Sequence, residues 1–192
     1  MMNRMIGALP WLLATLLVAG LTHFAAILIL PKVATRDAYE RLAARGEVDH
    51  MVLLPSGGAG GTAIPFLDPA TVQGLCFFDV EKVPVRVKAR VEEGRLLTLS
   101  FRTREGRIFY AMTDRAALHD TIDIRLVTES QLQQVEAGDD EEQGLPAELR
   151  LKTPGPKGLI VATALVARPS ERQDAEARIK AIDCHPEPLA AP

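Results

Sequence analysis

The stretch VPVRVKARVEEGRLLTLSF, residues 83–101, contains the pattern that decides the fold. Its first half alternates small apolar side chains with arginine and lysine, so one face of the chain is apolar and the other is charged. This alternation, with a period of two residues, is typical of a β-strand with one buried and one solvated face. The turn sequence at 92–95 separates it from a second alternating run through Leu97, Leu99 and Phe101. We therefore predict strands here and not helices.

The strand pattern continues towards the C-terminus. Residues 108–112 follow a second Gly-containing turn, so the region 83–112 predicts three sequential strands in an antiparallel meander. Apolar positions at 122–126 and 149–151 indicate two more strands, and a helix is expected at 129–137. The continuous apolar run at 159–166 is typical of the centre of a sheet. We expect one sheet of about six strands.

A helix is predicted near the C-terminus, where the period changes to that of an α-helix. Ser170 and Gln173 have the spacing of a capping box, in which each side chain bonds the backbone N–H of the other. Ala175, Ile179 and Ile182 then share one face. We expect this helix to end at Cys184 and to pack on the sheet. The predicted fold class is therefore α+β: an N-terminal transmembrane helix, then a mainly antiparallel β-sheet domain with a C-terminal helix packed on it.

The N-terminal segment at 9–30 has no formally charged side chain and is long enough to cross a bilayer as a helix. Trp11 lies near one end, as an interfacial anchor does. A cleaved signal peptide is the alternative, because Arg4 precedes the run and Val18-Ala19-Gly20 is a small-residue cleavage motif. The apolar run continues for ten residues past that motif, which favours an uncleaved anchor.

Different features of the sequence favour opposite orientations of this anchor in the membrane. Lysine and arginine are fewer before the span, at Arg4, than after it, and this count favours a cytoplasmic C-terminal part. The short, positively charged N-terminal tail is typical of a signal anchor, and the cysteines favour an oxidising compartment. We predict a single-pass protein of the bacterial inner (plasma) membrane with its C-terminal domain in the periplasm.

A stalk and a linker are expected between the anchor and the sheet. Thr35 can cap a short helix that runs to Arg45 and stops at Gly46, and the GGAGG sequence at 57–61 is typical of a flexible linker. The predicted organisation is an N-terminal tail at 1–8, the anchor at 9–30, the stalk helix and Gly-rich linker at 31–65, the β-rich domain at 66–185 and a flexible tail at 186–192.

The composition argues against several classes of ligand. A net charge of −3 lacks the basic surface that nucleic acid binding needs, so no nucleic acid partner is expected. The acidic run at 139–142 lacks the alternating carboxylates of a calcium loop and is predicted to be a solvated loop. We expect neither a metal site nor a cofactor.

The chain has two cysteines, Cys76 and Cys184, each on an element that is expected to pack in the core. In a translocated domain they can form a disulfide that ties the terminal helix to the sheet. In a cytosolic domain they would be two buried free thiols. A catalytic cysteine is disfavoured, because the sequence offers no identifiable base to stabilise a thiolate.

One cluster of polar residues is a candidate binding site. The candidates are Tyr110, Asp114, Arg115 and His119, which lie close together in the sequence near a strand end. His119 with Asp114 and Asp120 is the only cluster that resembles acid–base machinery. The same residue types are also ordinary turn formers, which favours a structural role. No catalytic residue is assigned.

Asp68-Pro69 and the segment Cys76–Arg115 resemble the bacterial domain of unknown function 1254 family, in its small version with one N-terminal membrane helix. The terminal helix up to Cys184 also fits, so the likeness spans most of residues 9–185. The chain departs from the family at Thr113, where members often have asparagine. The matching motifs are Phe78-Asp79, Leu99–Phe101, Gly106–Tyr110, Asp114-Arg115 and, in the stalk, Arg36–Tyr39.

This resemblance implies an envelope protein whose domain accompanies a domain of unknown function 1214, either in the same chain or on a separate partner protein, and it assigns no activity. The leading hypothesis is a membrane-anchored, non-catalytic component of the cell envelope that binds a partner protein. The alternative is a module or enzyme for an envelope glycan or lipid, with a pocket near Tyr110, Asp114, Arg115 and His119.

Overall fold

An exposed apolar helix, α1 (Met2–Val33), forms most of the first of two units, residues 1–41. The computed structural model describes residues 2–33, 38–43, 50–55, 68–138 and 148–189. Within α1, Gly7–Leu30 is 24 residues long with a mean hydropathy of 2.3, so it is long and apolar enough to cross a bilayer. Its large apolar side chains are exposed, whereas the hydroxyl groups of Thr15 and Thr22 donate to carbonyl oxygens four residues earlier in the helix.

A short helix, α2 (Ala38–Ala43), lies within the range of the predicted stalk helix. Thr35 and Gly46, expected at the ends of that helix, lie outside the described residues, as do the Gly-rich stretch at 57–61 and the acidic run at 139–142.

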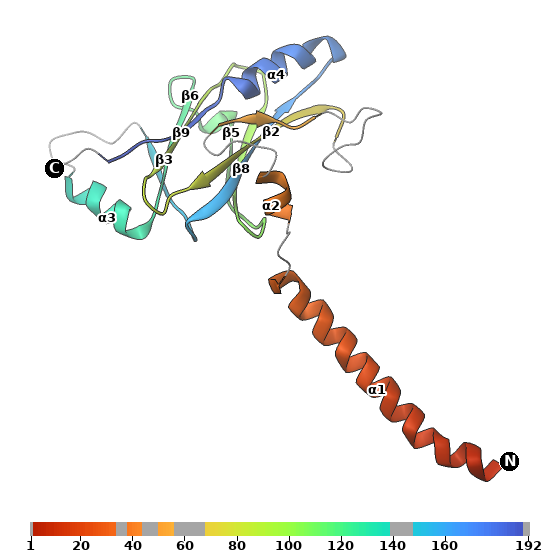
Figure 1. The fold of residues 1–192 in the computed structure, drawn as a ribbon. Coiled ribbons are helices and arrows are strands. Elements are labelled where there is room, and N and C mark those ends of the chain that lie inside the picture. Colours follow the sequence, from red (N-terminus) through yellow and green to blue (C-terminus); the bar gives the residue numbers. More distant parts are fainter. Residues whose placement is uncertain (1, 34–37, 44–49, 56–67, 139–147, 190–192) are drawn as a thin grey trace. The chain divides into compact units, whose positions relative to one another are not determined.

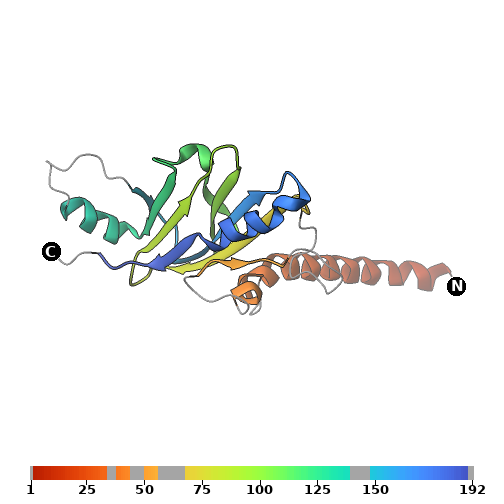
Figure 2. The same ribbon diagram turned by 90° about the horizontal axis from the view of Figure 1, so that it is seen from above.

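Two sheets form the second unit, residues 42–192 (Figures 1 and 2). Neighbouring strands are antiparallel except β6 and β7. Sheet A has the order β1 (Val52–Leu53), β2 (Thr71–Asp79), β8 (Lys157–Leu165), β4 (Leu97–Thr103), β5 (Ile108–Thr113). Sheet B has the order β7 (Leu149–Lys152), β6 (Thr121–Val127), β3 (Val85–Arg90), β9 (Asp183–Pro186).

The core contains alternate side chains from both sheets. In sheet B, Val85, Val87 and Ala89 of β3 are buried, as the alternation in the sequence predicts. In sheet A, Leu99 and Phe101 of β4 belong to the same apolar cluster. A strand with one apolar face is stable only when that face is covered, and here each sheet contributes side chains to one shared core.

The predicted single sheet with its three-strand meander is therefore wrong. β3 pairs with β6 and β9 in sheet B, whereas the next strand, β4, pairs with β5 and β8 in sheet A. The turn that contains Gly94, whose φ of 75° suits glycine, joins the two sheets and closes no hairpin. Only β4 and β5 form the expected hairpin. The prediction of a sheet centre at 159–166 is confirmed, because β8 lies between β2 and β4.

The helix α3 (Glu129–Gly138) confirms the helix predicted at 129–137. A capping box begins it: the N–H of Thr128 donates to the side-chain oxygen of Gln131 at 2.8 Å, and the N–H of Gln131 donates to the Thr128 hydroxyl at 3.3 Å. The buried Gln131 amide also donates to the carbonyl oxygen of Val80, which fixes the helix to the loop after β2.

The helix α4 (Arg172–Lys180) packs on β2 and β8, as predicted for the C-terminal helix (Figures 1 and 2). Its start and end differ from the prediction. Ser170 lies in the preceding 3₁₀ helix (Pro169–Glu171), and α4 begins without a side-chain cap. Cys184 lies on β9 and not on the helix, because the chain leaves α4 after Lys180 and pairs with β3. β9 runs to Pro186, which is the first residue of the predicted flexible tail.

A substitution at Gly158 tests the packing between β2 and β8. A Cβ atom there would meet the ring of Phe78 and the carbonyl oxygen of Arg102 too closely for either to give way cheaply. We expect Gly158→Ala to lower the free energy of unfolding by about 1–3 kcal/mol. Urea unfolding of the full chain in mild detergent, followed by circular dichroism, measures this. Gly155→Ala is the matched control, since a Cβ there meets open space; equal losses in both variants would contradict this packing.

Candidate functional site

The candidate residues from the sequence all lie in one segment that leads from sheet A to sheet B. Tyr110 is half-buried on β5, with its ring centroid 6.1 Å from that of Phe101. Asp114 and Arg115 lie in a 3₁₀ helix, η1 (Asp114–Ala116), and His119 is exposed in the turn that follows. Within the described residues, these four side chains form no hydrogen bond or ion pair with one another. They belong to one segment of the chain but make no acid–base pair with one another.

The turn after η1 has an unusual backbone. His119 and Asp120 have φ values of 51° and 58°, and Leu118 and Thr121 pair on either side of them through two backbone hydrogen bonds. Positive φ at both central residues is the geometry of a type I′ hairpin turn, which favours Asn-Gly. This hairpin therefore holds two non-glycine residues in a less favourable conformation, with both side chains exposed.

The outer face of sheet B carries a basic row that the sequence analysis missed. Arg86 lies directly opposite His185 of β9 on one side and Arg125 of β6 on the other, and Arg125 lies opposite Arg150 of β7. Like charges in directly opposed positions are unfavourable unless anions separate them. The row, His185, Arg86, Arg125 and Arg150, therefore requires acidic side chains close by.

Three acidic side chains separate the cations of this row: Asp123, Glu148 and Glu187. The guanidinium of Arg86 donates two hydrogen bonds to Asp123, at 2.9 and 2.8 Å, and a third to Glu187 at 2.9 Å. Arg125 lies 3.1 Å from Glu148, and these side chains are only 12–20% exposed except that of Glu187, at 30%. The carboxylates come from β6, from the segment before β7 and from the residue after β9. The network thus connects the strands of sheet B, with its cations and anions nearly balanced.

Protonation of the network follows from these contacts. Burial alone would raise the pKa of Asp123, but the hydrogen bonds and charge of Arg86, together with the charges of Lys88 and Arg125, outweigh it and lower that pKa below its ordinary value. The hydrogen bond to Asp123 raises the pKa of Arg86. Both partners are therefore charged at neutral pH, and the arrangement is one of structural ion pairs.

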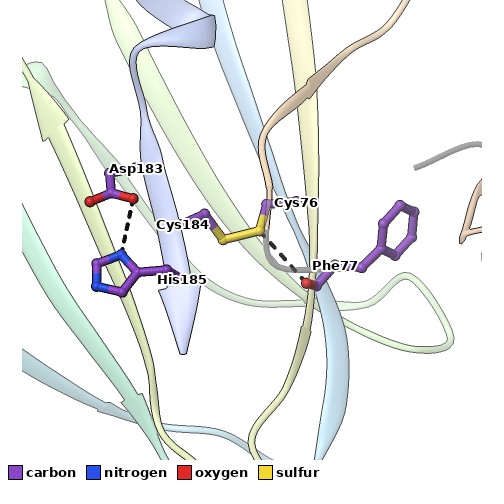
Figure 3. The surroundings of a disulfide bond; sticks show 5 residues. All are labelled: Cys76, Phe77, Asp183, Cys184 and His185. Atoms are coloured by element: carbon purple, nitrogen blue, oxygen red, sulfur yellow. Dashed lines mark hydrogen bonds and ion pairs between the residues drawn. A yellow bond between two sulfur atoms is a disulfide. The ribbon is translucent and has the colours of Figure 1, made fainter. Parts of the chain in front are cut away.

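A disulfide joins the two sheets beside this network. Cys76 of β2 and Cys184 of β9 are bonded, with their Cα atoms 6.7 Å apart, and both are buried (Figure 3). The prediction of a bridge is confirmed, although it joins strand to strand and not helix to sheet. Next to it, the Nδ1 atom of His185 lies 2.9 Å from a carboxylate oxygen of Asp183 (Figure 3).

A cavity of about 340 Å³ lies against the Cys184 end of this bond. Its walls hold two imidazoles, one amine and one carboxylate, and they contain no hydroxyl group and no free thiol. Among the described residues, no group of three or more His, Cys, Asp or Glu side chains could hold a metal ion. The lining residues are His50, Met51, Lys180, Ala181, Ile182, Asp183, Cys184 and His185.

β9 contributes residues to both the cavity and the basic row, and neither feature is evident from the sequence. The arginines occupy the polar positions of alternating strands, which is also what a merely solvated face looks like. Their neighbours across the sheet follow from strand order and register, and neither can be read from the polar positions alone.

Comparison with known proteins shows likeness of fold only. No protein family model and no curated protein matches the chain. The VPA0106 protein from Vibrio parahaemolyticus is similar in structure, with a TM-score of 0.54 and 13% sequence identity over 81% of this chain and 38% of that one. A putative uncharacterized protein from Burkholderia cenocepacia gives a TM-score of 0.46 and 11% identity over 89% of this chain and 43% of that one. The chain thus spans less than half the length of both.

Removal of the Asp123 charge tests the ion-pair network. We expect Asp123→Asn to lower the free energy of unfolding by about 2 kcal/mol at pH 7, because Arg86 loses a charged hydrogen-bond acceptor. The folded-state pKa of Asp123 is depressed, so this stabilisation is complete above the unfolded-state pKa of about 3.9 and is lost as the pH falls through the folded-state value.

Urea unfolding of wild type and variant at several pH values measures the difference, which should shrink in acid. Asp174→Asn is the control, because that carboxylate is 66% exposed and lies 3.9 Å from Arg95; we expect a change below about 0.5 kcal/mol. A deficit for Asp123→Asn that persists unchanged at pH 2 would show that the lost charge is not its cause.

Removal of the disulfide is expected to have a larger effect. The bond closes a loop with a sequence separation of 108, which the chain-entropy model values at about 4–5 kcal/mol. The variant Cys76→Ala/Cys184→Ala should lose a stability of this order, and a reductant should destabilise the wild type but not the variant. Unreduced wild type, once unfolded, should expose no thiol to an alkylating reagent; two alkylated cysteines would contradict the bond.

Proposed function

We propose that this protein is a membrane-anchored component of the bacterial cell envelope, whose two-sheet domain lies in the periplasm and binds a partner protein without catalysing a reaction. The observation that carries the proposal is the combination of α1, an exposed apolar helix, with a disulfide that is buried in the core of the other unit. The first fits a bilayer and the second fits an oxidising compartment.

The buried disulfide supports the orientation. Structural disulfides form and persist in the periplasm and are rare in the bacterial cytoplasm. The folded domain depends on this bond for a large part of its expected stability, so a cytoplasmic location would leave it weakened. This outweighs the count of lysine and arginine around the span, which favours the opposite orientation.

A role in binding a protein is supported by the exposed surface of the segment that leads from sheet A to sheet B. The free edge of β5, followed by η1 and the hairpin, presents exposed side chains of both kinds, among them Ile108, Leu118, Arg115 and His119. Exposed apolar groups beside polar ones are typical of sites where proteins bind one another. A protein that carries a domain of unknown function 1214 is the proposed partner, on the strength of the family resemblance.

The location is tested by fractionation and by a reporter enzyme that is active only outside the cytoplasm, fused to the C-terminus. We expect full-length protein in the membrane fraction, an active reporter, and a domain that external protease reaches in spheroplasts. The variant Leu16→Arg/Leu17→Arg should abolish membrane retention, because each central arginine costs about 2.5–3.5 kcal/mol on insertion scales; Leu16→Ile/Leu17→Ile is the control. A soluble product that begins after Gly20 would show a cleaved signal peptide and overturn the proposal.

Binding is tested by crosslinking in intact cells and purification in mild detergent. A stoichiometric protein that remains with Asp114→Ala/His119→Ala supports a binding role. Loss of a bound glycan or lipid from that variant, with its fold intact, would instead favour the alternative of a ligand-binding module or enzyme with a pocket near Tyr110, Asp114, Arg115 and His119.

A further inference from the structure

The two sulfur atoms of the disulfide differ in how they can be reached. Cys76 has no exposed surface and is not among the described residues that line the cavity, whereas Cys184 forms part of the cavity wall. The cavity of about 340 Å³ is about ten times the volume that one water molecule takes up in the liquid, so the thiol group of another molecule can enter it. A thiol in the cavity therefore meets the Cys184 end of the bond.

The cavity wall also has a cation beside this sulfur. Lys180, at the end of α4, lines the cavity, and its ammonium group makes no ion pair within the described part of the chain. The one carboxylate of the wall, that of Asp183, lies 2.9 Å from the Nδ1 atom of His185 (Figure 3). Thiolates are the attacking and leaving species in thiol–disulfide exchange, and a nearby cation stabilises them. The wall therefore favours this reaction at Cys184.

The strands at the two ends of the bond differ in how firmly they are held without it. β2 has nine residues and pairs with β1 and β8, whereas β9 has four residues and, among the described strands, pairs with β3 alone. The Sγ atom of Cys76 lies 3.6 Å from the carbonyl oxygen of Phe77, so a thiol at Cys76 would find an acceptor in the core (Figure 3). Loss of the bond therefore leaves β2 in place and weakens the hold on β9.

We propose that the disulfide is a redox switch, which a dithiol opens through the cavity and which releases β9. One thiolate of the dithiol attacks the Sγ atom of Cys184, and the Sγ atom of Cys76 leaves as a thiolate and takes a proton from water. The second thiolate of the dithiol then attacks the reductant sulfur of the mixed disulfide, and Cys184 leaves and is protonated in turn. The dithiol becomes a disulfide and loses two electrons, which the two cysteines gain. This goes beyond the proposed function, in which the bond is structural.

Release of β9 changes the edge and the outer face of sheet B. The backbone groups of β3 that bond β9 become free, so β3 becomes an edge strand. Glu187, one residue beyond β9, moves away with it, and Arg86 and Arg125 lose an acidic partner that lies 2.9 and 3.4 Å from them. The reduced domain therefore presents a free strand edge and a more basic face than the oxidised domain.

The route of attack is tested on the purified full chain in mild detergent, without denaturant. Glutathione followed by acid quenching and peptide mass spectrometry should place the adduct on Cys184 and not on Cys76. Ala181→Phe, in the cavity wall, should slow reduction by dithiothreitol at least tenfold. Ala177→Phe is the matched control, since this exposed residue of α4 does not line the cavity, and its rate should equal that of the wild type. An adduct on Cys76, or equal rates in the two variants, would overturn the proposal.

A destabilised variant separates attack on the folded protein from attack on the unfolded chain. Gly158→Ala lies away from the cavity and should be reduced at the rate of the wild type. If the bond were reached only after global unfolding, this variant would react about tenfold faster, because it unfolds more often. That result would overturn the proposal, as would a folded wild type that dithiothreitol does not reduce.

Release of β9 is measured by hydrogen exchange of the oxidised and the reduced protein. In the reduced protein, the amides of Asp183–His185 should exchange as fast as those of an unstructured chain, whereas those of β8 should remain protected. In the oxidised protein both strands should be protected. Protection of β9 after reduction would overturn the switch, and so would loss of protection throughout the domain. These measurements use purified protein, so their outcome does not depend on the location that fractionation tests.

Discussion

The bond between Cys76 and Cys184 holds the last strand of the fold in place. β9 has only four residues and pairs with β3 alone, so its hydrogen bonds give a weak hold by themselves. The disulfide fixes it to β2 of the opposite sheet. Glu187, one residue beyond β9, can then reach Arg86 and Arg125, and this separates the cations of the basic row. A covalent bond in the core thus helps to place one of the three carboxylates of the outer face.

The local elements of the fold could be predicted from the sequence, because their causes are local. Along Val85–Arg90, the alternation of apolar and charged residues is enough to predict a strand with one buried face. The start of α3 also has a local cause, the capping box of Thr128 and Gln131. The arrangement of the strands could not be predicted, because the turn at Gly94 permits either a hairpin or a crossing between sheets. The chain crosses between the sheets because this arrangement buries the apolar faces of both sheets against each other.

The features of the candidate site also differ in whether they could be predicted from the sequence. The disulfide was within reach of sequence reasoning, because the chain has only two cysteines and both are in apolar surroundings. The basic row was not, since the opposition of Arg86 and Arg125 depends on register and on strand order. A solvated arginine and one that is bonded to two carboxylates occupy the same kind of position in an alternating pattern. Only the three-dimensional neighbours distinguish them.

In the proposed topology, the helix and the disulfide depend on the same event. Export through α1 brings Cys76 and Cys184 to an oxidising compartment, and only there can the bond that fixes β9 form. A chain that stays in the cytoplasm would keep two thiols, and β9 would be held by β3 and by the ion pairs of Glu187 alone. Such ion pairs, partly exposed, contribute far less than a closed loop of this length. Correct folding of the C-terminal strand would therefore be completed after translocation, which couples the stability of the domain to its place at the membrane.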